Sequence, residues 1–314
     1  MKSRNSWIIF LFFFHLLLVI FLFSARLGTV DISWQAFWES FVTKNPQNLA
    51  SVVIRDLRIP RFFMAALAGG SLAMAGQAMQ ILVRNPLADP YTMGTASGAA
   101  LGVNLVLSGF LPAAFAASWF LPFWGFAGAL LTTFLVLAIV ASQKRPENSV
   151  FLLIGVAVSI LANSLISLLT YFAARENEVR HMLFWAFGNL DKSNWDSLVL
   201  LSVVALPTSL VVAVAQPYWN LLLLGDQKAA SLGIPVGWAK RILLILSAIL
   251  TTMVVCTVGP IGFVGLVVPF WVRKWRPVTH PQFWYLNFLS GAAFLSFCDL
   301  IARIALPSTG LPIG

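Results

Sequence analysis

The chain has 314 residues, of which 59% are hydrophobic and 10% are charged, and its mean hydropathy is +0.87. Soluble domains carry about 25% charged residues, so this composition excludes a sizeable soluble domain and predicts a polytopic membrane protein. The formal net charge of +9 indicates basic loops at the cytoplasmic membrane surface, and not a nucleic-acid partner, because the chain is otherwise so apolar.

The predicted membrane spans follow one another along the whole chain. Runs of about 20 apolar residues are typical of spanning helices and not of an outer-membrane barrel, so we expect an all-α, polytopic transmembrane helical bundle of nine spans within a single domain, residues 1–314. The spans are expected at about 7–23 and 60–82, then from 94 onwards, and then at 119–141, 150–173, 197–215, 241–258, 263–271 and 283–304. The first apolar run is longer than the core of a signal peptide, which favours an uncleaved span.

Small residues and chain breaks mark particular places in these spans. Two sets at near four-residue spacing predict close helix contacts. The sets are Gly69, Ala73 and Gly76 in the second span, and Gly94, Gly98 and Gly102 in the third. Gly259-Pro260-Ile261-Gly262 breaks the chain within apolar surroundings, where non-helical backbone must be shielded by protein. Residues 26–58 and 174–196 are surface excursions, the second with a short helix expected at His181–Phe187.

Residues capable of chemistry are sparse. Cys256 and Cys298 lie in apolar segments, which predicts packing roles without a disulfide. The histidines are too far apart for metal-ligand spacing, and no stretch matches the phosphate-binding G-x-x-x-x-G-K-[ST] loop. We therefore expect no catalytic residue, no cofactor and no metal site.

The distribution of charge predicts the topology. With the N-terminus inside, 11 basic and 3 acidic residues fall on the inner side, and 9 basic and 8 acidic residues on the outer side. This bias favours the N-inside orientation. It places Lys144 and Lys228 in the cytoplasm and Glu176 outside.

The segment Leu221–Val236 reads LLLLGDQKAASLGIPV and is too polar to cross a bilayer. Gly233 and Pro235 predict the end of a helical turn or two on the cytoplasmic side. By spacing alone this segment could be an ordinary loop between two spans.

Several motifs resemble the FecCD permease family. The first is Gly225-Asp226-x-x-Ala229-x-x-Leu232-Gly233, which is similar to the family's cytoplasmic coupling loop. The others follow in the family's order over about 58–313: Arg58-Ile-Pro-Arg61, Gly76-x-x-Met79-Gln80 with Asn85-Pro-Leu-Ala-Asp-Pro90, Gly259-Pro-Ile-Gly-Phe-Val-Gly-Leu-Val-Val-Pro269, and Asp299-Leu-Ile-Ala-Arg303. The resemblance implies a BtuC-like permease subunit of an ABC importer for iron-siderophore, haem or cobalamin.

Two features depart from the family pattern. Phe270 stands where the family usually has His, and Gly310 stands where a Glu is common. The sequence ends at Gly314, where the family's tenth helix would begin, so nine spans are counted and that helix is missing or truncated.

The resemblance also implies partners and site residues. The coupling loop at 221–236 would insert into a cassette ATPase subunit through Gly225, Asp226, Ala229, Leu232 and Gly233. A periplasmic or lipid-anchored substrate-binding protein would dock on Arg58, Arg61 and Arg303, and the cytoplasmic end of the pathway would be narrowed by Asn85 and Leu87. A second permease copy or paralogue would complete the pathway in the inner membrane of a bacterium or archaeon.

Each of these assignments has a simpler alternative. The arginines could be interfacial anchors, with Arg303 paired to Asp299 one helical turn away, and Asn85-Pro86 supplies turn chemistry unaided. An ion-coupled secondary transporter is the competing function, but the spans are nearly free of the charges such carriers use. An intramembrane enzyme ranks last because no nucleophile–base pair or acid cluster appears.

Overall fold

The computed structural model describes residues 4–28, 32–42, 49–110, 120–143, 148–172, 187–305 and 313–314. Within these ranges all regular structure is helical, as the sequence predicts. The short helix expected at His181–Phe187, the charges at Lys144 and Glu176, and Gly310 fall outside these ranges, apart from Phe187 itself.

Seven helical segments are long and apolar enough to cross a membrane. They correspond to α1 (Arg4–Arg26), α4 (Ile59–Val83), α6 (Leu121–Ser142), α7 (Asn148–Phe172), α9 (Trp195–Val214), α12 (Val236–Val258) and α14 (Phe283–Ala305). The other two expected spans form α5 (Thr95–Leu107) and α13 (Val264–Trp275), of 13 and 12 residues. Helices of this length reach only about 20 Å, against a hydrocarbon core of about 30 Å, so the described residues do not confirm these two as spans.

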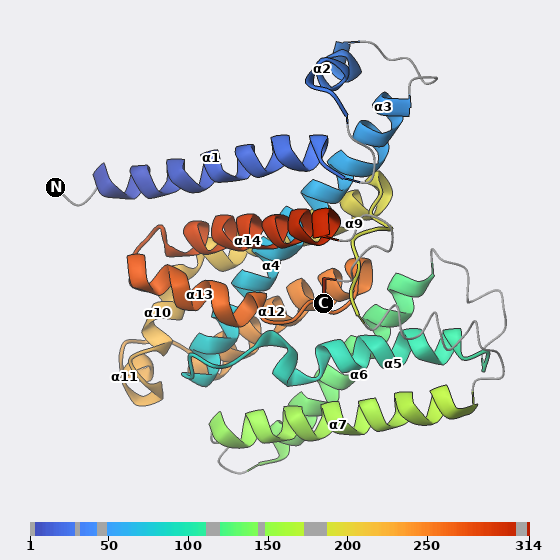
Figure 1. Cartoon of the computed structure of the whole chain (residues 1–314). Coiled ribbons are helices and arrows are strands. Elements are labelled where there is room, and N and C mark those ends of the chain that lie inside the picture. Colours follow the sequence, from blue (N-terminus) through green and yellow to red (C-terminus); the bar gives the residue numbers. More distant parts are fainter. Residues whose placement is uncertain are drawn as a thin grey trace.

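Short helices lie at the two ends of this bundle. They are α2 (Trp34–Val42), α3 (Leu49–Val52), η1 (Val53–Arg58), η2 (Pro90–Met93), α10 (Gln216–Leu222) and α11 (Asp226–Ser231). In Figure 1, α10 and α11 lie at the end that also carries the N-terminus, whereas α2 and α3 lie at the opposite end. The short helices of 34–52 and of 216–231 therefore lie at opposite ends of the long helices.

Helix α4 lies at the centre of the bundle, and glycines let two other helices approach it closely. A Cβ atom added to Gly69 would lie 2.2 Å from the carbonyl oxygen of Gly291 on α14. One added to Gly76 would lie 1.9 Å from that of Gly265 on α13. The predicted small-residue face of α4 thus forms two contacts with two different helices.

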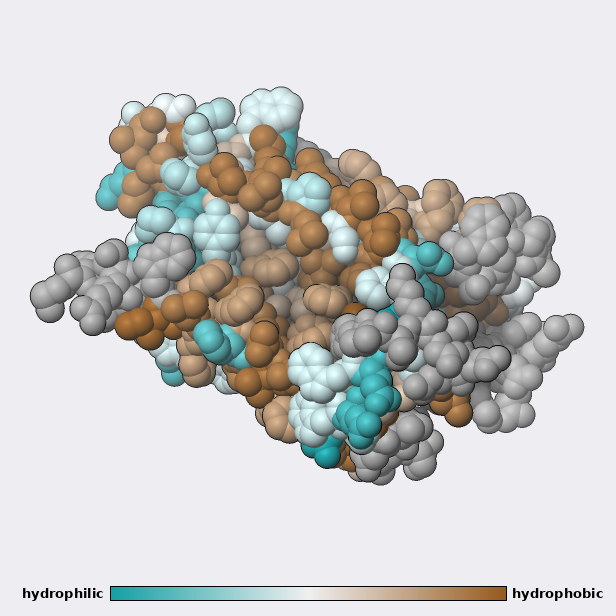
Figure 2. All heavy atoms as spheres, turned by 90° about the horizontal axis from the view of Figure 1, so that it is seen from above, coloured by the Kyte–Doolittle hydropathy of each residue, from teal (hydrophilic) through white to brown (hydrophobic). Residues whose placement is uncertain are grey.

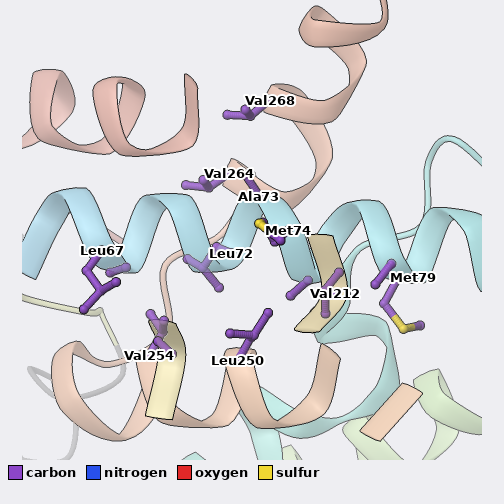
Figure 3. Close-up of a cluster of buried hydrophobic side chains, with 14 of the residues drawn as sticks. Leu67, Leu72, Ala73, Met74, Met79, Val212, Leu250, Val254, Val264 and Val268 are labelled. Carbon is purple, nitrogen blue, oxygen red and sulfur yellow. The ribbon is translucent and has the colours of Figure 1, made fainter. Parts of the chain in front are cut away.

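The hydrophobic core surrounds α4 on its other sides. In Figure 3, Leu72 points toward Leu250 on α12, while Ala73 lies on the side that faces Val264 and Val268 of α13. The outer surfaces are also apolar, and Figure 2 shows hydrophobic residues spread over the middle of one face. A bundle that is apolar both inside and outside is what a membrane environment requires.

The predicted break after α12 is shielded as expected. Gly259 ends the helix with φ +78°. The carbonyl of Val258 accepts a hydrogen bond from the Asn189 N–H at 2.7 Å, and the Ile261 N–H donates to the Tyr91 hydroxyl at 3.1 Å. These partners satisfy backbone groups that would otherwise be unpaired in apolar surroundings.

Candidate functional site

Residues 221–236, here the coupling segment, form the short helix α11 between two glycines with positive φ. Gly225 precedes it with φ +103°, and Gly233 follows it with φ +83°. The N–H of Gly233 donates to the Ala230 carbonyl at 3.0 Å, and that of Ile234 to the Ala229 carbonyl at 3.1 Å. This pair of bonds is the Schellman pattern, so the predicted end of the helix at Gly233 is confirmed.

The side chains of the coupling segment divide into inward and outward sets. Ala229 is fully buried within the chain, so its small size serves internal packing and it presents no surface to a partner. Leu232, by contrast, is 59% exposed, and Leu224 and Trp238, within eight residues of it in the sequence, are also exposed. Large exposed apolar residues on a polar end of the molecule are candidates for a protein contact.

Asp226 is held by two basic residues of the same chain. Lys240 Nζ lies 2.7 Å from one carboxylate oxygen, and the guanidinium of Arg84 contacts the other. The Arg84 Nε also donates to the carbonyl of Leu222 at 3.1 Å. Arg84 and Lys240 were not predicted as site residues, and the only signal in the sequence was opposite charge on loops assigned to the same side.

The ionisation of Asp226 follows from these contacts. Partial burial opposes its ionisation, but the hydrogen bond and charge of Lys240, together with Arg84, outweigh that effect and lower the pKa of the Asp226 carboxyl. The Asp226 carboxyl is therefore ionised at neutral pH.

The turn expected to narrow the cytoplasmic end begins directly after Arg84. Asn85 Oδ1 accepts the Leu87 N–H at 2.9 Å, and the Asn85 carbonyl accepts the Ala88 N–H at 3.1 Å. Turn chemistry thus accounts for Asn85. Leu87 needs a separate explanation, since its side chain is 69% exposed.

Arg61 and Arg303 lie together at the opposite end, around one buried carboxylate. Asp299 is 1% exposed; its oxygens lie 2.7 Å from Arg61 Nη2 and 3.1 Å from Arg303 Nε. The pairing of Arg303 with Asp299 that the sequence allowed is therefore present. Arg61 also contacts Asp191, whose side chain is 40% exposed. The sequence did not single out Asp191, which is 130 residues away from Arg61 in the chain.

Arg58 lies at the end of α1, where Arg303 also donates to Ser24, and is only 5% exposed. Its Nη1 donates to the carbonyls of Ala25 at 2.8 Å and Arg26 at 2.5 Å. These are carbonyls at the C-terminus of α1, where a cation satisfies groups left without helical partners. The structure therefore gives Arg58 an internal capping contact, and its expected docking role stays a prediction.

Long apolar helices with polar contacts at both ends define a multi-pass membrane protein, and comparison with known proteins identifies its kind. Residues 16–314 match the FecCD transport family, and the chain belongs to this family. It is 36% identical to the cobalamin import system permease protein BtuC of Halobacterium salinarum, over 84% of this chain and 70% of that protein. It is 33% identical to the hemin transport system permease protein HmuU of Yersinia pestis, over 95% and 88% of the two chains.

A solved structure shows the same architecture. A metal-chelate-type ABC transporter described in an inward-facing conformation superposes with a TM-score of 0.86 and 27% identity, covering 98% of this chain and 94% of that one. The protein is thus the permease subunit of an ABC importer, which is a transport subunit.

Proposed function

We propose that this permease subunit admits a haem, cobalamin or iron-siderophore cargo to the cytoplasm, driven by ATP hydrolysis on a separate cassette ATPase subunit. The observation that carries the proposal is the match along residues 16–314, together with relatives named for cobalamin and hemin transport. Nothing in the described spans favours an ion-coupled carrier, because Arg61, Asp299 and Arg303 lie near one end of their helices, where Asp299 and Asp191 balance the two arginines.

The cargo is tested by uptake. The permease is reconstituted with its ATPase and binding protein in proteoliposomes and supplied with cyanocobalamin, hemin or a ferric siderophore. We expect ATP-dependent accumulation of one of the three and none when either partner is omitted. Uptake that proceeds without an ATPase but follows an imposed ion gradient would establish the secondary-transporter alternative.

We infer further that the ATPase docks on the coupling segment. Leu224 and Leu232 supply exposed apolar anchors, and the glycines at 225 and 233 leave open space beside them, since an added Cβ atom would meet nothing within 4 Å. Asp226 and Ala229 act indirectly, by holding α11 in place. An apolar anchor flanked by small residues suits insertion into a groove of a partner protein.

Docking is tested by replacing Leu232 with Asp. A central apolar anchor carries about 2 kcal/mol or more of binding energy, so the ATPase should co-purify at least about tenfold less well. Lys228→Ala is the matched control, because Lys228 is exposed on the same helix. Equal recovery of the ATPase with Leu232→Asp and wild type would rule out this docking face.

The opposite end is proposed to receive the binding protein, which would be periplasmic or lipid-anchored. Among the three arginines expected to dock the binding protein, we infer the main role for Arg61, because it is paired with Asp191, whose side chain is 40% exposed. Arg303 and Arg58 shape this surface from beneath through their contacts with Asp299 and the end of α1. An acidic group on the binding protein would displace Asp191 from Arg61 Nη1, while Nε and Nη2 of the same guanidinium stay with Asp299.

Asp191→Asn should therefore speed the association of the loaded binding protein, chiefly at low salt, because it removes the competing carboxylate. Asp196→Asn, at another exposed acid of the same region, is the control. Slower association with Asp191→Asn than with the control would show that the binding protein uses Asp191 itself.

The remaining partners follow from the family. A second permease copy or paralogue would pack on the apolar outer surfaces, and membrane lipid would cover the rest. The location proposed is the inner membrane of a bacterium or archaeon, with the coupling segment in the cytoplasm and Asn85 and Leu87 near the inner end of the pathway.

A further inference from the structure

The carboxylate of Asp226 connects the ends of four helices. Asp226 is the first residue of α11, and Lys240 lies near the start of α12. Arg84 caps the end of α4 and also binds the carbonyl of Leu222, the last residue of α10. The cluster of Arg84, Asp226 and Lys240, here called the ion cluster, therefore ties α4, α10, α11 and α12 together at one point.

Arg84 has an unusual backbone conformation. Its φ of +55° lies in the left-handed region. Among the described residues, Phe263 is the only other non-glycine residue with a positive φ. Glycine adopts this conformation without the steric cost that a side chain brings. The Arg84 side chain offsets that cost through its contacts with Asp226 and Leu222. The next residue, Asn85, starts the turn that carries the exposed Leu87.

We propose that the ion cluster couples the coupling segment mechanically to the turn at Asn85–Leu87, so that movement of the first moves the second. This link is here called the joint. The inference rests on the proposed function, and it assigns Arg84 and Lys240, with Asp226, as positioning residues. Partly exposed ion pairs contribute little to stability, so the value of the cluster is geometric. A displacement of α11 pulls on Arg84, and because Arg84 and Asn85 share a peptide bond, the turn must follow.

Thiol labelling at Leu87 tests this joint without knowledge of the cargo. Leu87→Cys is introduced into the permease–ATPase complex, and its reaction rate with a maleimide is measured without nucleotide and with ATP plus vanadate. In the otherwise wild-type complex, nucleotide should change the rate at least about fivefold, a typical size for coupling between sites. The protein without Leu87→Cys corrects for labelling of Cys256 and Cys298.

Variants then separate the side-chain link from the backbone turn. Arg84→Gly keeps the left-handed conformation at no steric cost but removes the guanidinium, so the nucleotide response should be lost while ATP hydrolysis continues. Asp226→Asn should lose the response in the same way. Asp226→Glu and Arg84→Lys retain the charges and should recover part of it, and Lys228→Gln on the same helix should retain all of it.

Two results would refute the proposal that the ion cluster transmits this movement. One is a normal nucleotide response in both Arg84→Gly and Asp226→Asn. The other is loss of the bound ATPase in these variants, since the ion cluster would then serve docking instead of transmission. Failure of the wild-type chain to bind any cassette ATPase would refute the proposed function itself, and the joint with it.

Discussion

Gly76 and Gly265 meet where α4 crosses α13, and neither position has room for a side chain. A Cβ atom at Gly76 would lie 1.9 Å from the Gly265 carbonyl oxygen, and one at Gly265 would lie 2.7 Å from Pro90 Cδ. Backbone atoms cannot yield as a flexible side chain can, so the helices would have to separate. Single residues of α4 therefore determine how closely the helices of the bundle pack.

Gly76→Ala should lower the stability of the permease by about 1–3 kcal/mol, the usual cost of overpacking a core. Gly237→Ala is the control, because Gly237 is also helical but an added Cβ there meets nothing within 4 Å. The control should be neutral or slightly stabilising, by up to about 1 kcal/mol. Thermal unfolding in detergent measures both, and equal midpoints for the two variants would contradict the packing argument.

Asp299 is the residue on which the outer charge network depends. It is buried and faces two guanidinium groups, so Asp299→Asn leaves both without their shared counter-charge. Breaking such a buried pair costs about 3–5 kcal/mol. Asp191→Asn removes an exposed partner instead and should cost less than about 1 kcal/mol. Thermal unfolding distinguishes them; the ranking fails if Asp191→Asn lowers the midpoint as much as Asp299→Asn does.

At the scale of elements, α11 has only six residues and depends on its surroundings to remain helical. It is held by the Schellman bonds at Gly233, by the ion pairs of Asp226 and by burial of Ala229. A short helix fixed at both ends can move as a rigid unit, which suits a contact that transmits force. Its orientation is therefore set by the permease before any partner binds.

Ala229→Trp should destabilise the permease in the absence of an ATPase, by about 1–3 kcal/mol, because the side chain points into the chain. Leu232→Trp, at an exposed position of the same segment, should leave the isolated permease unaffected. Comparable thermal midpoints for Ala229→Trp and wild type would show that the site is less tightly packed than the structure shows.

At the scale of the whole molecule, the described ion pairs fall into two groups, at opposite ends of α4. The ion cluster lies at one end, and the network around Asp299 lies at the other. The charge bias of the sequence assigns the first end to the cytoplasm.

The assignment predicts opposite accessibility for two exposed positions. Cysteine placed at Lys228 should react with an impermeant thiol reagent only after the cells are permeabilised, whereas cysteine at Asp56 should react in intact cells. The wild-type protein supplies the background from its own thiols. Labelling at position 228 in intact cells would invert the topology and remove the ATPase-docking proposal.

Much of the fold could be predicted because a helix that crosses a membrane needs about 20 consecutive apolar residues. Apolar runs gave the long helices within a few residues of their observed ends, as in α12 and α14. The segments at α5 and α13 are not confirmed as spans, since apolar composition does not report whether a helix is long enough to cross. The break at Gly259 was also foreseeable, because Gly and Pro cannot continue a buried helix unaided.

The sequence by itself determined that this is an all-helical membrane protein, that α11 ends at Gly233, and that its motifs are those of the FecCD family. These properties depend on local composition and on the order of motifs. Only the tertiary structure decided which charges meet: Asp226 with Arg84 and Lys240, and Arg61 with Asp191 and Asp299. It also turned Ala229 and Arg58 inward. The physical reason is that ion pairs and burial depend on contacts between distant segments, which spacing along one chain does not encode.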